Sequence, residues 1–284
     1  MAGGGVSITS DFLLADLQSP WLVLLAWLVG GGLAACGALC YGALARRLPE
    51  SGGEYLFLSR TLHPAAGAMA GWISIVVGFA APLAAAALAF GEYTRDWLPG
   101  SSPQWLGSGL LCGLALIHAL RMEGGARLHN LTVALEMLLI GAFAVLALAR
   151  LPAEVLTRPT PDSSSAAGFA VGLIWVSFSY YGWNAAVYVA GEVRDAERNL
   201  PRSLLIGTAL VTGLYLALNA AFVFAAPWEE LAGQAEIGRL AAQALGGALW
   251  ADTLTALIAL VLAASVSAMT VAGSRVYARM ATDG

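Results

Sequence analysis

Seven long apolar runs divide the chain, and they restrict what it can fold into more than any other feature. A helix needs about 20 apolar residues to cross the hydrocarbon core of a bilayer. The runs that meet or approach this length lie at residues 21–45, 65–91, 105–120, 131–149, 166–191, 203–227 and 251–273. A shorter apolar element, residues 5–17, precedes them. We therefore predict an all-α, polytopic membrane helix bundle, and because no linker divides it, a single transmembrane domain over 1–284.

Composition agrees with an outer surface that faces lipid. Charged residues make up only 11% of the chain, whereas soluble domains carry about 25%. A net charge of −4 gives no basic surface for nucleic acid. Neither an H-E-x-x-H nor a G-x-S-x-G motif occurs, and Cys36, Cys40 and Cys112 lack histidine or acidic partners at metal-ligand spacing. An enzyme, a metal site and a bound cofactor are therefore not expected.

Arginine is distributed unequally between alternate connections of the predicted spans. One set carries Arg46, Arg47, Arg60, Arg121, Arg127, Arg194, Arg198, Arg202, Arg275 and Arg279. The other set carries only Arg95, Arg150, Arg158 and Arg239. Because positive charge favours the cytoplasmic side, the first set is expected in the cytoplasm and the chain in the cell membrane. The opposite loop, residues 227–250, is expected to contain an amphipathic helix on the outer surface.

Two segments contain residues that interrupt a membrane helix. Gly3, Gly4 and Gly5 open the first element, and the segment 177–184 (SFSYYGWN) lies halfway through the sixth. Unwound backbone in a membrane must line a protected cavity, and such breaks at corresponding positions indicate a transporter binding site. The N-terminus of one half-helix suits a carboxylate, and free carbonyls suit an ammonium, so an α-amino acid fits both. Glycine is also a common packing residue between membrane helices, which remains the alternative.

Four stretches then resemble the amino acid–polyamine–organocation superfamily of amino acid permeases. Residues 3–7 (GGGVS) look like the family's break in helix one, and 41–55 (YGALARRLPESGGEY) is similar to its helix-two exit. Residues 178–204 (FSYYGWNAAVYVAGEVRDAERNLPRSL) look like the break and exit of helix six. Residues 272–284 (AGSRVYARMATDG) resemble the end of helix eight.

The resemblance implies a secondary active transporter that moves amino acids by alternating access. It also implies part of a five-plus-five inverted repeat with discontinuous first and sixth helices, beginning inside helix one and stopping after helix eight. The alternative is a non-transporting fragment, or an assembly partner, of a truncated permease. By this resemblance, the N–H groups of Gly4, Gly5 and Val6 hold the substrate carboxylate, and carbonyls near Phe178 and Ser179 hold its amine. Tyr180, Tyr181 and Asn184 shape the side-chain pocket. Gly3 also belongs to the expected substrate-binding residues, as does Ser7, which stands where the family commonly has Phe and affects the pocket size on that side.

Polar residues elsewhere in the chain could couple transport to an ion or form a gate at the cytoplasmic end. Glu136 lies inside an apolar run, so it should pair, face a cavity or be protonated. Structural hydrogen bonding, proton coupling and snorkelling of the side chain to the interface are all open. Ser265 and Ser267 could line an ion site or join helices. Glu192, Arg194 and Arg275 could form an inner gate or be only solvated helix ends. The expected partners are an amino acid, the bilayer, and a coupled proton or sodium ion, with no prediction of the oligomeric state.

Overall fold

The computed structural model is a bundle of helices, and it describes residues 6–120, 125–157, 166–234 and 237–283. Five of its helices are long and apolar enough to cross a membrane: α2 (Pro20–Arg47), the continuous helix Pro64–Trp97, α6 (Pro103–Leu120), α10 (Ala196–Val223) and α13 (Ala248–Asp283). The apolar helices α7 (Gly125–Leu148) and α9 (Ala166–Ser179) lie among them. All regular structure in these ranges is helical, which confirms the predicted all-α membrane bundle.

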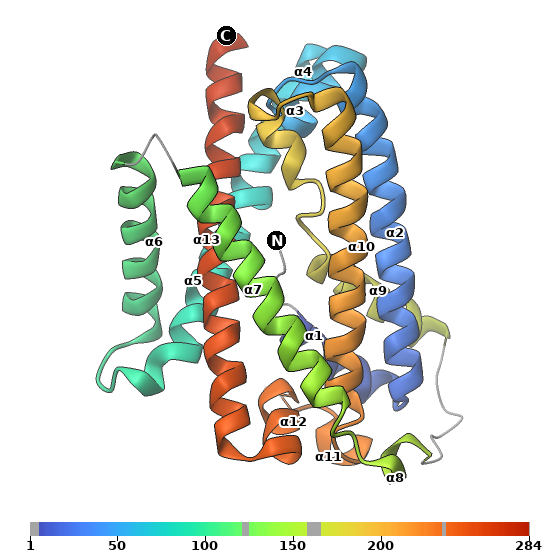
Figure 1. Ribbon diagram of the computed structural model, residues 1–284. Helices are drawn as coiled ribbons and strands as arrows, with labels where there is room; N and C mark the ends of the chain where they lie inside the picture. Colours follow the sequence, from blue (N-terminus) through green and yellow to red (C-terminus); the bar gives the residue numbers. More distant parts are fainter. Residues whose placement is uncertain (1–5, 121–124, 158–165, 235–236, 284) are drawn as a thin grey trace.

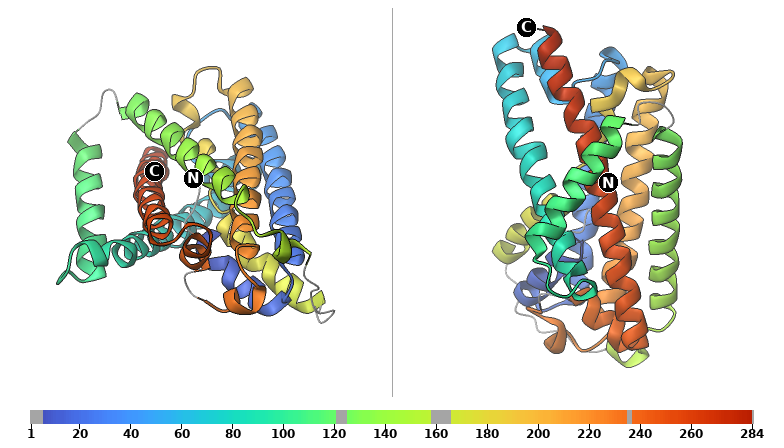
Figure 2. Two further views of the ribbon diagram at one scale, coloured as in Figure 1. Left: turned by 60° about the horizontal axis from the view of Figure 1, so that its bottom comes forward. Right: turned by 90° about the vertical axis from the view of Figure 1, so that its left-hand side faces the viewer.

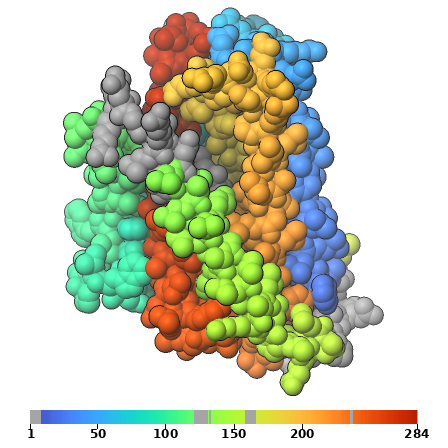
Figure 3. Space-filling view, in the orientation of Figure 1, coloured from blue at the N-terminus to red at the C-terminus, as the bar shows by residue number. Residues whose placement is uncertain are grey.

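The long helices α2, α6, α10 and α13 run along a similar direction, and most of the short helices lie at the two ends of the bundle (Figure 1). α2 and α10 lie side by side over most of their length, and α13 packs against α5 (Ala81–Thr94) and α6. α7 crosses the face between α10 and α13 (Figure 3). The short helix α1 (Val6–Leu17) packs against α9, α2 and α10.

Glycines allow α2 to approach its neighbours closely. A Cβ atom on Gly31 would lie 2.4 Å from Thr212 Cγ2 on α10, and one on Gly37 would lie 2.6 Å from the Trp183 ring. Without a hydrophobic driving force between helices in lipid, close packing of this kind stabilises the bundle. Trp27 of α2 then packs against Tyr215 of α10, with ring centroids 5.2 Å apart.

One end of the bundle collects the connections rich in arginine. α2 ends there at Arg47, α10 begins there, and α13 ends there (Figure 1). The connecting helix α3 (Gly53–Thr61) covers this end, and we call it the Arg-rich end. The opposite end carries η2 (Arg95–Trp97), α8 (Ala153–Leu156), α11 (Trp228–Leu231) and α12 (Ile237–Gly246).

The loop at residues 227–250 forms two short helices rather than one. The apolar side of α12, which includes Ile237 and Ala241, is buried. Gly238 on that side lies close to Leu254 of α13 and Phe222 of α10. α12 therefore covers the end of the bundle through its apolar face.

Two of the predicted spans depart from regular α-helix. The helix that begins with α4 (Pro64–Ile73) passes through a π-helical segment, η1 (Ser74–Ala80), before it continues as α5. π-helical segments are rare and frequent at functional sites. The sixth element breaks as predicted: α9 ends at Ser179, residues 180–184 form turns, and a 3₁₀ helix, η3 (Ala185–Glu192), follows. The matching prediction for Gly3, Gly4 and Gly5 concerns residues outside the described ranges.

Candidate functional site

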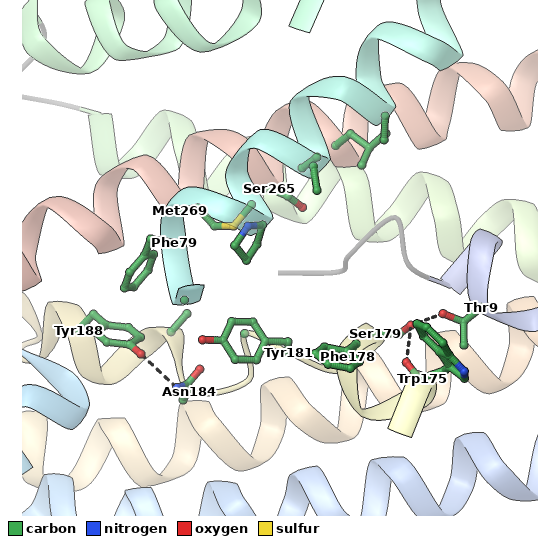
Figure 4. Close-up of a pocket in the computed structure, with 18 residues that line it drawn as sticks. Thr9, Phe79, Trp175, Phe178, Ser179, Tyr181, Asn184, Tyr188, Ser265 and Met269 are labelled. Carbon is green, nitrogen blue, oxygen red and sulfur yellow. Dashed lines mark hydrogen bonds between the residues drawn. The ribbon is translucent and has the colours of Figure 1, made fainter. Parts of the chain in front are cut away.

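A cavity of about 420 Å³ lies beside the break between α9 and η3. Its walls come from the first turn of α1, from η1 and α5, from the end of α9 with the break and the start of η3, and from the middle of α13 (Figure 4). The lining residues are Thr9, Gly78, Phe79, Pro82, Ala85, Ala86, Ala89, Trp175, Phe178, Ser179, Tyr181, Gly182, Asn184, Ala185, Tyr188, Leu262, Ser265 and Met269.

Two helix ends of opposite polarity meet at this cavity. Thr9 lies in the first turn of α1, and Ser179 is the last residue of α9. Their hydroxyl oxygens share a hydrogen bond of 2.7 Å (Figure 4). A helix N-terminus carries partial positive charge and a C-terminus partial negative charge. The cavity therefore offers both polarities within a short distance.

The unwound backbone after Ser179 contains a glycine with a positive φ angle. Gly182 has φ = 106°, a left-handed conformation that other residues rarely adopt. In the described part of the chain, the amide N–H groups of residues 182, 183 and 184 donate to no backbone carbonyl. The carbonyl of Ser179 accepts from the Tyr215 hydroxyl at 3.2 Å and keeps a second lone pair. Such polar backbone is tolerated in a membrane only where it lines a cavity.

The rest of the lining is apolar or aromatic. Tyr181 lies close to η1, since a Cβ atom on Gly78 would be 3.0 Å from the Tyr181 hydroxyl. Phe79 packs edge-on against Tyr188, with centroids 5.0 Å apart. None of the described residues that line the cavity is charged. The polar groups of these lining residues are thus hydroxyls, one amide, the indole N–H of Trp175 and the backbone.

A cluster of hydrogen bonds surrounds the carboxylate of Glu54, next to the cavity. Its Oε1 accepts from the Tyr41 hydroxyl at 2.9 Å and from Asn184 Nδ2 at 2.6 Å. Its Oε2 accepts from the Tyr188 hydroxyl. Asn184 and Tyr188 both line the cavity, so Glu54 lies directly behind its wall.

Further contacts join α13 to neighbouring loops at the Arg-rich end. Arg275 forms an ion pair with Glu192, and Arg279 pairs with Glu50 at 2.7 Å. The Tyr55 hydroxyl donates to Asp283 at 3.1 Å. Burial, together with this hydrogen bond, raises the pKa of the Tyr55 hydroxyl above its ordinary value, so it stays a neutral donor.

The structure brings several predicted site residues together. Phe178, Ser179, Tyr181, Asn184 and Ser265 all line the cavity. Glu192 and Arg275 form the ion pair named above, whereas the nearby Arg194 uses its carbonyl to accept from Asn199 Nδ2 at 2.6 Å. Val6 begins α1, and Ser7 follows it. Gly3, Gly4 and Gly5 lie outside the described residues.

Three predicted residues lie elsewhere. Tyr180 points away from the cavity: its hydroxyl donates to the Trp27 carbonyl at 3.0 Å, and its ring packs against Trp27 and Tyr215. Ser267 faces α6, where its hydroxyl lies 2.8 Å from His118 Nε2. Glu136 is 4% exposed in α7 and does not line the cavity.

Sequence reasoning assigned no role to several residues that build the site. Thr9, Phe79, Trp175 and Tyr188 line the cavity, and Glu54 supports it. Thr9 follows the glycine run by one helical turn, which was a usable signal. Glu54 lies in the quoted stretch 41–55, but nothing in its local sequence indicates contact with residues 184 and 188.

Comparison with known proteins agrees with this architecture. The family model described as amino acid permease matches residues 1–284. The chain is 30% identical to the b(0,+)-type amino acid transporter 1 of Mus musculus, over 97% of this chain and 58% of the relative. It is 29% identical to the large neutral amino acids transporter small subunit 2 of Mus musculus, over 87% and 49%. It is 26% identical to the Asc-type amino acid transporter 1 of Homo sapiens, over 81% and 46%.

The chain spans about half the length of these relatives. The match nevertheless covers the bundle, the break after α9 and every wall of the cavity. As the resemblance to the amino acid–polyamine–organocation superfamily predicted, this chain belongs to the amino acid permease family.

Proposed function

We propose that the chain binds an α-amino acid in the cavity beside the α9 break and moves it across the cytoplasmic membrane by alternating access. The observation that carries the proposal is the meeting of the α1 N-terminal turn and the α9 C-terminal turn, joined by the Thr9–Ser179 hydrogen bond. A zwitterion needs both polarities at one place. This arrangement supplies them without a charged side chain.

The substrate carboxylate is assigned to the first turn of α1, where the early N–H groups of a helix have no intrahelical partner. Gly4, Gly5 and Val6 remain the residues proposed to hold it, with Gly3 and Ser7 as neighbouring residues of the site. The ammonium is assigned to the carbonyls at the end of α9, near Phe178 and Ser179. The spare lone pair on the Ser179 carbonyl supports this orientation.

The substrate side chain is assigned to the apolar part of the cavity. Phe79, Tyr181 and Met269 line that part, and none of them can neutralise a charge. A neutral, apolar amino acid is therefore favoured. One of the relatives is a large neutral amino acids transporter small subunit, which agrees with this preference.

Alternating access requires that the Arg-rich end opens, and we place that end in the cytoplasm by the positive-inside rule. The Arg275–Glu192 ion pair joins α13 to η3 there, which supports its role in the inner gate. Glu136 is proposed to exchange a proton during the cycle, because an ionisable group buried in a membrane helix is costly unless it functions.

Binding is tested by titrating the purified chain with each of the twenty amino acids while following thermal unfolding. A bound ligand raises the melting temperature as its concentration exceeds the dissociation constant. We expect the largest rise for large neutral amino acids. No rise with any amino acid would contradict the proposed cavity. Binding without uptake into liposomes would instead favour the alternative, a fragment that acts as an assembly partner.

A further inference from the structure

Glu54 lies in the first turn of α3, at the Arg-rich end of the bundle. Its carboxylate joins three elements that are distant in sequence: α2 through Tyr41, the helix break through Asn184, and η3 through Tyr188. Asn184 and Tyr188 are buried and line the cavity. The carboxylate therefore holds the cavity wall from the side of the Arg-rich end.

The backbone before Glu54 is shaped to deliver this carboxylate. Gly52 and Gly53 have φ values of 135° and 55°, both in the region that favours glycine. A Cβ atom on Gly53 would lie 2.3 Å from Tyr188 Cε1. The Tyr188 ring thus rests on the loop, with Phe79 packed edge-on against it. Any movement of Tyr188 away from the cavity wall has to separate it from this loop.

We propose that Glu54 is the positioning residue that keeps the inner end of the cavity closed. The inference rests on the proposed transport function, because a closed end matters only if it also opens. Opening toward the Arg-rich end requires Asn184 and Tyr188 to leave the Glu54 carboxylate. Glu54 itself does not line the cavity, so it acts through these two residues rather than on a substrate.

Two groups of contacts could keep this end of the cavity closed: the hydrogen bonds of Glu54 and the Arg275–Glu192 ion pair. We compare their strength. The side chains of Arg275 and Glu192 are 39% and 55% exposed, and exposed ion pairs contribute little. Hydrogen bonds to a carboxylate are about twice as strong as neutral ones, and Glu54 accepts three of them. The Glu54 cluster therefore contributes more to the closed end than the Arg275–Glu192 ion pair does.

The test measures access to the cavity in the purified full chain. Cys36, Cys40 and Cys112 are exposed and are replaced by alanine, and Ala185→Cys then places one thiol in the cavity wall. The rate of reaction with a water-soluble maleimide reports how often the cavity is open. We expect Glu54→Ala to raise this rate about tenfold, through loss of the charge-assisted hydrogen bonds. Glu54→Gln should raise it less, because an amide oxygen still accepts.

Two further variants keep the result interpretable. Tyr188→Phe retains the ring packing but removes the donor to Glu54, so it should also raise the rate, and it decides the matter if Glu54→Ala does not fold. Glu92→Gln is the control, since Glu92 pairs with Arg95 at the opposite end of the bundle and should leave the rate unchanged. Folded Glu54→Gln and Tyr188→Phe proteins that react at the parent rate would overturn the inference.

Amino acid binding is measured on the same proteins by thermal shift. Failure of the parent chain to bind any amino acid would count against the proposed function while leaving the labelling result to decide the role of Glu54. Binding by the parent, with labelling unchanged in every Glu54 and Tyr188 variant, would reject the role of Glu54 alone.

Discussion

Thr9 and Ser179 are 170 residues apart in sequence, yet their hydroxyl oxygens share a hydrogen bond of 2.7 Å. The bond joins the start of one helix to the end of another inside an apolar bundle. Each hydroxyl also borders the cavity. The same contact therefore has two consequences, one for stability and one for ligand binding.

Replacing Thr9 with valine separates these two consequences. The substitution keeps the shape and removes the hydroxyl, so it should lower the free energy of unfolding by about 1 kcal/mol, the usual net value of one hydrogen bond. Amino acid affinity should fall by about tenfold, because the Thr9 hydroxyl is lost beside the proposed position of the charged substrate, and hydrogen bonds to charged groups are stronger than neutral ones. Thermal unfolding with and without ligand measures both. Thr253→Val is the matched control: Thr253 bonds only to the Leu249 carbonyl of its own helix, and affinity should not change.

Gly182→Ala tests the conformation of the helix break. With φ = 106°, this position strains any residue that carries a Cβ atom, and the free energy of unfolding should fall by about 1–2 kcal/mol. Gly207→Ala provides the comparison, because it lies within α10 with no atom near the added Cβ. There alanine should be neutral, or stabilising by up to about 1 kcal/mol. Equal melting temperatures for the two variants would refute the assigned backbone.

Neighbouring glycines of α2 test its contact with α10. A Cβ atom on Gly31 would meet Thr212 at 2.4 Å, whereas one on Gly32 meets nothing within 4 Å. Gly31→Ala should destabilise the bundle by about 1–3 kcal/mol through overpacking. Gly32→Ala should not destabilise it. Unfolding monitored by tryptophan fluorescence distinguishes the pair, and the reverse order would mean that α2 is rotated relative to this structure.

Glu136→Gln tests proton coupling in liposomes loaded with a pH-sensitive dye. Glutamine keeps the size of the side chain but cannot exchange a proton, so proton movement during amino acid uptake should disappear while ligand binding persists. Glu154→Gln serves as control, since Glu154 lies exposed in α8. Proton movement that continues unchanged in Glu136→Gln would leave Glu136 a structural residue.

Local sequence was enough to predict an all-α membrane bundle and a break in its sixth element. The apolar runs indicated where membrane helices lie, because lipid requires internal pairing of the backbone and therefore helix. The break at 180–184 was also visible locally, as a glycine among aromatic and polar residues at mid-membrane depth. The π-helical segment 74–80 was not, since its sequence is as apolar as the α-helices on either side.

Side-chain placement depended on packing between distant segments. Tyr180 and Tyr181 are identical neighbours in a predicted site, yet Tyr180 bonds to the Trp27 carbonyl in the core and Tyr181 lines the cavity. Glu54 lies in the first turn of α3, where the local sequence gives no sign of its partners 130 and 134 residues away. The sequence by itself therefore determined an α-helical membrane bundle with a broken sixth element. Only the tertiary structure decided which side chains share the cavity, because that depends on how each helix is rotated against its neighbours.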